Sequence, residues 1–222
     1  MAMGTWIGTG MGRVGRACAS ASAGPLLAAL VIAAPVTAQE EDLSPPARPG
    51  EVAFLRVVMP VGETARIAGH NLVPAPDSPA TPYAAVDEAP EIVVADVLAR
   101  LATPAGGHYS YLWGLGGTGT LVADMMPADA SEAVLRLYNL SSVAGVELWI
   151  VGQEGAAVTG LGPIAGEGIV VAPGVIEAEL RAQGQSLGVV EAIEALPGRG
   201  VSVALWGDPG SLGVSVFADV HE

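Results

Sequence analysis

The stretch "PAGGHYSYLWG", residues 104–114, indicates the fold, because it returns in outline as "PGRGVSVALWG", residues 197–207. Aligned without a gap, the two copies share a proline, a glycine three residues later and a closing Leu-Trp-Gly. The residues between these points suit an extended chain that is entered through a Pro-Gly turn. The pattern predicts an internal duplication of a strand.

A second pair of segments supports the duplication. "EVAFLRVVMP" (51–60) and "EAVLRLYNLS" (132–141) share an alanine and a Leu-Arg step, so that Arg56 and Arg136 match. The arginines are 80 residues apart, whereas the matched Trp113 and Trp206 are 93 apart, so the second copy is 13 residues longer between its landmarks. We therefore expect two related domains of unequal length, with Trp113, Trp149 and Trp206 in or beside their cores and a common packing role for the matched pair.

The first residues have the pattern of an export signal. Arg13 and Arg16 precede an apolar run (25–35) that is too short to span a bilayer, and small residues end at Ala38. Residues 1–38 are therefore predicted to be a signal peptide. Cys18, the lone cysteine, lies inside it, so the predicted mature chain has neither disulfides nor a thiol nucleophile.

Short apolar runs between glycine and proline breaks predict an all-β fold, with two tandem small antiparallel β-sandwich domains. We expect a flexible lead-in at 39–50, a first domain at 51–126 and a second at 131–222, joined by "MMPADAS" (125–131). The segments "EIVVADVLARL" (91–101) and "GVVEAIEAL" (188–196) also fit a helix. Their valines and isoleucines favour a strand for each.

The charge of the mature chain narrows the choice of partners. Seven arginines, no lysine and 23 acidic residues give a net charge of −16. Such a surface repels nucleic acid and anionic polysaccharide at long range. Charge that serves solubility alone is the other interpretation. Both argue against a module that binds polyanions.

No catalytic, cofactor or metal site is predicted. The histidines are His70, His108 and His221; the last is penultimate and is expected to be frayed. Nothing in the sequence supplies the geometry of a Ser-His-Asp triad, and two internal histidines without cysteine cannot form the usual zinc patterns. "GLGGTG" (114–119) has dinucleotide-type spacing, but no helix follows, so a hairpin turn explains it better.

At residues 107–142, "GHYSYLWGLGGTGTLVADMMPADASEAVLRLYNLSS", the chain resembles the AlgF family, periplasmic accessory proteins of bacterial alginate O-acetylation. The segment 196–207, "LPGRGVSVALWG", is similar to the closing turn and strand of that family. The resemblance implies tandem β-sandwiches, export to the periplasm and service to protein components of an O-acetylation complex that contains a membrane-bound acyltransferase and periplasmic Ser-His-Asp transferases. It implies no catalytic residue in this chain.

With these features we expect a non-catalytic adaptor in which each domain docks a different component of the acetylation complex. The mature chain would not span the membrane, and its contact with polysaccharide would be weak or absent. If acetyl groups are relayed at all, only hydroxyls, His70 and His108 could hold them, because lysine is absent. Two alternatives stay open: a carbohydrate-binding module with exposed aromatic residues, and a generic secreted β-repeat scaffold.

Overall fold

The computed structural model describes residues 52–76, 78–87, 89–114 and 116–221. The predicted signal peptide and lead-in lie outside these residues. Within the described part, no helix is long and apolar enough to cross a membrane.

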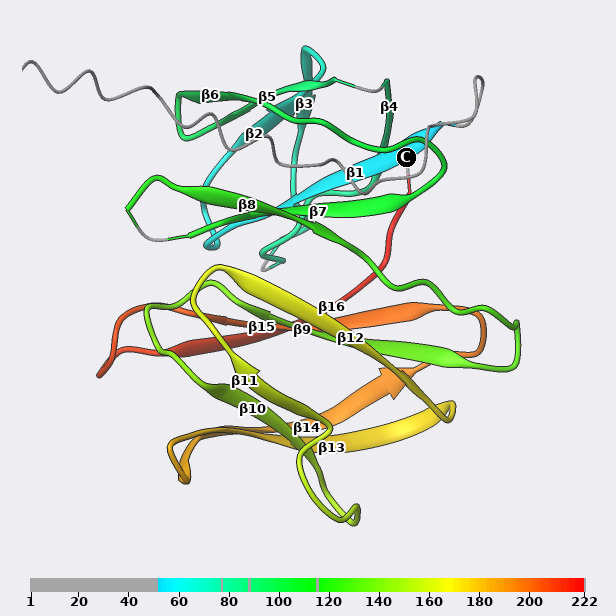
Figure 1. Ribbon diagram of the computed structural model, residues 1–222, viewed down its shortest axis with the longest axis vertical. Helices are drawn as coiled ribbons and strands as arrows, with labels where there is room; N and C mark the ends of the chain where they lie inside the picture. The colour runs from blue at the N-terminus through cyan, green and yellow to red at the C-terminus, as the bar shows by residue number, and fades with distance from the viewer. Residues whose placement is uncertain (1–51, 77, 88, 115, 222) are drawn as a thin grey trace, which may run out of the picture. The chain divides into compact units, whose positions relative to one another are not determined.

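Eight strands form the first sandwich (Figure 1). One sheet has the strand order β4-β1-β7-β8 and the other β3-β2-β5-β6. Alternate side chains of both sheets fill a core that contains Leu55, Ile92 and Trp113. The strands are β1 (Ala53–Val58), β2 (Ala65–Ile67), β3 (His70–Leu72), β4 (Ala84–Val86), β5 (Glu91–Val94), β6 (Val97–Arg100), β7 (His108–Trp113) and β8 (Gly119–Ala123).

Eight further strands form the second sandwich, with sheets β12-β9-β15-β16 and β11-β10-β13-β14 (Figure 1). Its core includes Leu137, Leu148, Leu180 and Val203, all of them inaccessible to solvent. The strands are β9 (Ala133–Asn139), β10 (Val146–Ile150), β11 (Val158–Leu161), β12 (Ala165–Val171), β13 (Gly174–Ala182), β14 (Gln185–Ala195), β15 (Gly200–Trp206) and β16 (Gly213–Ala218).

The strand order of the second sandwich is that of the first with eight added to every strand number. The predicted all-β class with two tandem sandwiches is confirmed, and the topology repeats as the duplication requires. Most strand pairs are antiparallel, but each sandwich also has one parallel pair, β1 with β7 and β9 with β15. In both copies the duplicated Leu-Arg strand therefore lies directly beside the duplicated Leu-Trp strand.

The extra length of the second copy lies largely in one hairpin. Strands β13 and β14 have 9 and 11 residues, whereas their counterparts β5 and β6 have 4 each. The predicted strand at 188–196 is confirmed within β14. At 91–101 strand conformation is confirmed over helix, but the strand is not continuous: a two-residue turn at Ala95 and Asp96, both with positive φ, folds this segment into the β5–β6 hairpin. The predicted turn at 114–119 does join β7 to β8.

A third apolar layer lies between the sheet that contains β1 and the sheet that contains β9. It includes Val58 and Leu112 from the first sandwich and Tyr138, Leu140 and Phe217 from the second. Because these side chains are buried, the two sandwiches share a continuous interior in addition to their separate cores.

Candidate functional site

The two duplicated arginines meet inside this third layer. Arg56 lies on β1 and Arg136 on β9, and each side chain is 1% exposed. A guanidinium cannot lose its charge at physiological pH, so both need close acceptors in order to be buried.

Each sandwich supplies those acceptors from equivalent positions. Ser110 on β7 is the register partner of Arg56, and Ser202 on β15 is that of Arg136. Asp124 follows β8 directly, and Asp219 follows β16. We use the name arginine network for these six residues together with two tyrosines: Arg56, Ser110, Asp124, Arg136, Ser202, Asp219, Tyr83 and Tyr138.

Asp124 is the acceptor at one end of the network. Its carboxylate accepts hydrogen bonds from Ser110 Oγ at 2.6 Å, from the Tyr83 hydroxyl at 2.7 Å and from the Tyr138 hydroxyl. Tyr138 belongs to the second sandwich, so this carboxylate joins the two halves. Its side chain is 1% exposed.

Asp219 binds both arginines at the other end. Its Oδ1 lies 3.0 Å from Arg56 Nη1 and 2.9 Å from Arg136 Nη1. Arg136 also donates from Nε to the carbonyl oxygen of Met125, at 3.0 Å, within the segment that joins the sandwiches. Gly200 leaves the space for this pair, because a Cβ there would lie 2.2 Å from both Arg136 Nη1 and Asp219 Oδ2.

Arg56 uses its remaining donors across the same layer. Nε donates to Ser110 Oγ at 2.8 Å, while Nη2 donates to the Tyr138 hydroxyl at 2.8 Å and to Ser202 Oγ at 3.2 Å. The guanidinium carbon also lies 4.4 Å from the centre of the Tyr83 ring. One arginine of the first sandwich thus donates hydrogen bonds to three residues of the second, Tyr138, Ser202 and Asp219.

The network is balanced in charge, with two guanidiniums and two carboxylates. Burial alone would lower the pKa of Arg56, but the oxygens of Tyr138 and Tyr83 and both carboxylates outweigh burial and raise it. Burial raises the pKa of Tyr138 to about 12, so its hydroxyl keeps its proton and donates a hydrogen bond to Asp124. Among the described residues, no buried polar side-chain atom lacks a partner. Such a network fixes geometry strongly, although removal of one member leaves an uncompensated buried charge.

The network does not have the geometry of a nucleophilic triad. Ser110 donates directly to Asp124, with no histidine between them, and its residue is fully buried. A serine nucleophile needs a neutral base beside it and access to a substrate. The arrangement is therefore suited to holding the two sandwiches together.

His108 and His221 meet beside the network, with ring centres 5.4 Å apart. Phe54 stacks on His108 at 4.8 Å, and Tyr83 stacks on His221 at 5.2 Å. The prediction that His221 is frayed is wrong, because it forms a β-bridge with Tyr83, whose amide donates to the carbonyl of Val220. The pKa of His108 is lowered, chiefly by burial and secondly by the proximity of His221.

His70 is placed apart from this pair, as the exposed first residue of β3. Within the described residues, no three His, Cys, Asp or Glu side chains gather in a way that could hold a metal ion.

The tryptophans do not share one packing role. Trp113 lies in the first core, whereas Trp206 packs against the layer between the sandwiches. The strand register makes Trp113 equivalent to Leu205, so the matching of the two tryptophans is off by one residue. A shift of one residue reverses the face of a strand. Trp149 lies on the outer face of its sheet, 4.6 Å from the Arg181 guanidinium carbon.

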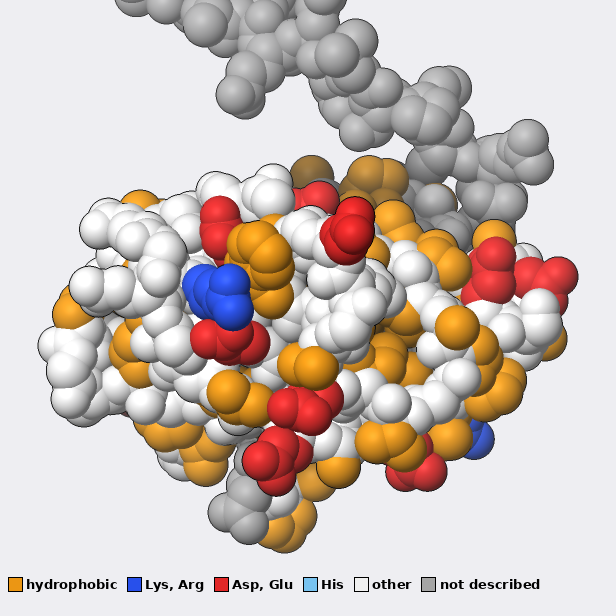
Figure 2. Space-filling model, turned by 90° about the horizontal axis from the view of Figure 1, so that it is seen from below, with side chains coloured by type: hydrophobic (Ala, Val, Ile, Leu, Met, Phe, Trp, Pro, Cys, Tyr) orange, Lys and Arg blue, Asp and Glu red, His pale blue; other side chains and the backbone are white. Residues whose placement is uncertain are grey.

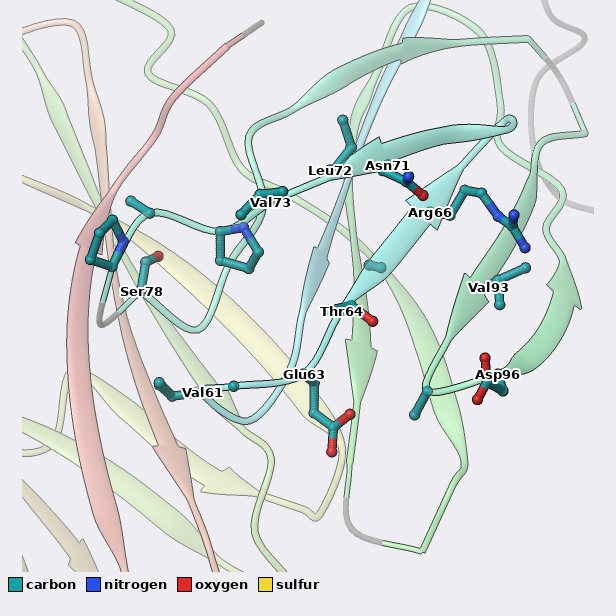
Figure 3. A pocket seen from close by; sticks show the side chains of 16 residues that line it. Val61, Glu63, Thr64, Arg66, Asn71, Leu72, Val73, Ser78, Val93 and Asp96 are labelled. Carbon is teal, nitrogen blue, oxygen red and sulfur yellow. The ribbon is translucent and has the colours of Figure 1, made fainter.

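A pocket of about 690 Å³ opens in the first sandwich (Figure 3). Apolar side chains, including Val61 and Val73, line one part, and Glu63, Arg66 and Asp96 line another. None of the described residues that line it is aromatic, so they offer no stacking surface for a sugar ring.

Comparisons with known proteins assign this chain to no family. No protein-family model and no curated protein matches this chain. Among solved structures, the C-terminal domain of AlgF from P. aeruginosa resembles part of it, with 18% identity and a TM-score of 0.35. The match covers 40% of this chain and 98% of that domain. At this level the likeness transfers no residue role.

Sequence reasoning found Arg56 and Arg136 but missed the rest of the network. The signal was present in "LVADM" (121–125) and "VFADV" (216–220), which place an Ala-Asp step after the last strand of each copy. Tyr138 has no equivalent tyrosine in the first copy, because the equivalent position on β1 is occupied by Val58. No comparison between the copies could have found it.

Proposed function

We propose that this chain is a non-catalytic periplasmic adaptor for the O-acetylation of an alginate-like exopolysaccharide, with its two sandwiches docking different protein components of the acetylation complex. The structural observation that supports an adaptor is the arginine network. A bridging protein must hold its docking surfaces at a fixed separation, and charge-assisted hydrogen bonds across the third layer provide this. The resemblance in sequence at 107–142 and 196–207 supports the acetylation system as its setting.

Export is part of the same proposal. We infer cleavage after Ala38, which would leave Gln39 as the first residue of the mature protein. Mass spectrometry of the periplasmic fraction tests this step. Recovery of the intact chain from Met1 in that fraction would contradict it.

The test of function compares strains. We expect a strain without this gene to make the polymer but to lose its O-acetyl groups, measured as acetate released by alkali per uronate residue. The parent gene and the variants His70→Gln and His108→Gln should all restore acetylation, because neither histidine is assigned a catalytic role. Unchanged acetylation in the deletion strain would overturn the proposal.

The purified mature protein gives a second arm. We expect no turnover of a chromogenic acetyl ester and no acetyl transfer to oligouronate. Turnover that disappears in His108→Gln would assign an acetyl relay in place of an adaptor. The full chain must be used, because a cut near Pro127 would separate Arg56 from Tyr138, Ser202 and Asp219.

A further inference from the structure

The outer face of the sheet β11-β10-β13-β14 combines apolar and acidic side chains in an unusual way. Cross-strand register places Trp149 beside Glu179, which is beside Val189, and places Glu147 beside Arg181. We call this surface the acidic platform; its residues are Glu147, Trp149, Val151, Val175, Glu177, Glu179, Arg181, Val189 and Glu194. Figure 2 looks onto this side of the molecule and shows a basic side chain beside apolar ones, with acidic side chains around them.

Most of the acidic platform is built from the hairpin that distinguishes the second copy from the first. Strands β13 and β14 are more than twice as long as β5 and β6. Six of the nine platform residues lie on these two strands. The duplicated scaffold alone therefore does not account for this surface.

Trp149 and Arg181 are held in place at its centre. The indole N–H donates to Glu147 at 2.9 Å, and the Arg181 guanidinium carbon lies 4.6 Å from the ring centre. Arg181 Nε donates in turn to Glu179 at 2.8 Å. Tryptophan and arginine are the residue types that most often dominate binding energy at protein interfaces, and fixing them beforehand lowers the entropy lost on binding.

Three exposed valines lie on the same outer face. Val151 follows β10 and is 57% exposed, Val189 is paired with Glu179 and is 55% exposed, and Val175 is paired with Glu194 farther along β13 and is 74% exposed. The solvent face of an antiparallel sheet is ordinarily polar, so Trp149 together with Val151 and Val189 forms an apolar centre that a partner can cover.

The charge of the platform identifies the chemistry of that partner. Glutamates outnumber arginine four to one, and Glu177 and Glu194 make no hydrogen bond or ion pair with any described side chain. A second copy of this acidic chain and a uronate polymer are both anionic, so both are repelled. A surface with lysine or arginine around aliphatic side chains complements both the charge and the apolar centre.

We propose that the acidic platform is the docking surface for a partner protein that presents basic side chains around aliphatic ones. This inference rests on the adaptor function proposed above, because it names the surface by which the second sandwich binds its partner. The platform's glutamates steer the partner and fix its orientation, while Trp149 and the valines are buried on contact.

A titration of the full mature chain tests the platform directly. The probe is a short peptide in which lysine and leucine alternate, and amide chemical shifts in nuclear magnetic resonance report where it binds. We expect shifts concentrated in β10, β13 and β14 and affinity that falls as salt rises. The double variant Glu177→Gln/Glu194→Gln should weaken binding about tenfold.

A matched control separates a specific surface from general attraction. Glu63→Gln/Asp96→Asn removes the same charge from the first sandwich and should leave the affinity unchanged. Equal weakening by both double variants, shifts spread over both sandwiches, or no binding would overturn the proposal. Equally tight binding at these strands by the same peptide with glutamate in place of lysine, or by oligouronate, would also overturn it.

Binding of the peptide is measured separately from acetylation, so the two proposals can fail independently. If the platform variant binds poorly and still restores acetylation fully, the platform is not the docking surface while the adaptor function stands. If deletion of the gene leaves acetylation unchanged, the adaptor function fails whatever the peptide does.

Discussion

Asp219 is the residue on which the contact between the sandwiches most depends. Its carboxylate pairs with both buried guanidiniums, so Asp219→Asn would leave two positive charges with Asp124 as their remaining carboxylate. Breaking a buried ion pair from one side typically costs about 3–5 kcal/mol. We expect the free energy of unfolding to fall by about that amount, measured by urea denaturation at neutral pH.

Asp208→Asn is the matched control for this change. Asp208 is an exposed residue of the turn between β15 and β16. Its substitution should change stability by less than about 0.5 kcal/mol. Equal stabilities for the two variants would mean that the arginines are satisfied without Asp219.

His108 makes stability depend on pH. Its pKa lies below the ordinary value of 6.5. Burial is the largest cause and the positive charge of nearby His221 is the second; Arg136 also lowers the pKa, whereas Asp219 and Asp124 raise it. The unfolded chain then takes up a proton at a higher pH than the folded chain. The unfolding free energy should therefore fall as pH decreases through 6.5. The contribution of His108 to this fall should stop below the pKa of His108 in the folded state.

His108→Gln should flatten that decline. Urea denaturation of the parent and the variant at about pH 8 and at about pH 5.5 gives the comparison, because packing loss is common to both pH values while the proton linkage is not. A folded-state pKa above 6.5 for His108, measured by nuclear magnetic resonance, would contradict the prediction.

At the scale of elements, the β5–β6 hairpin is closed by residues that do not suit its turn. Val94 pairs with Val97, and the residues between them, Ala95 and Asp96, have φ values of 46° and 65°. Such a turn favours asparagine at its first position, and alanine is strained there. Ala95→Asn should raise the free energy of unfolding by up to about 1 kcal/mol, measured by thermal and urea denaturation.

Ala144→Asn serves as the comparison for this variant. Ala144 is exposed in a bend and does not have a positive φ. It should gain nothing from asparagine. An equal gain at both positions would attribute the effect to the side chain alone and not to the turn.

The elements also show how far the sequence could be interpreted. Apolar runs and the repeated Leu-Arg step identify the strands and the duplication, because periodicity and composition determine them locally. Trp113 and Trp206 fall on opposite faces because the spacing of landmarks cannot detect a slip of one residue between paired strands. Asp219 contacts Arg56, and His221 contacts Tyr83, across more than a hundred residues of sequence. No local sequence pattern encodes contacts of this range.

At the scale of the whole molecule, the two sandwiches should unfold together. The buried layer between them and the arginine network make each sandwich less stable when the other is unfolded. We expect one calorimetric transition, with equal calorimetric and van't Hoff enthalpies. Two resolved transitions in the parent protein would contradict this coupling.

The long reach of Asp219 also imposes an order on biosynthesis. It is separated from Arg56 by 163 residues, so a chain that is made from its amino end completes the first sandwich's eight strands long before the carboxylate for its central arginine exists. At that stage the second sandwich has not covered Arg56, so its guanidinium is still hydrated, and Tyr138, Ser202 and Asp219 are all missing. A chain that stops before Asp219 would have to bury both arginines with Asp124 as their one carboxylate, so we expect truncated products to be degraded faster than the full chain in a pulse-chase measurement.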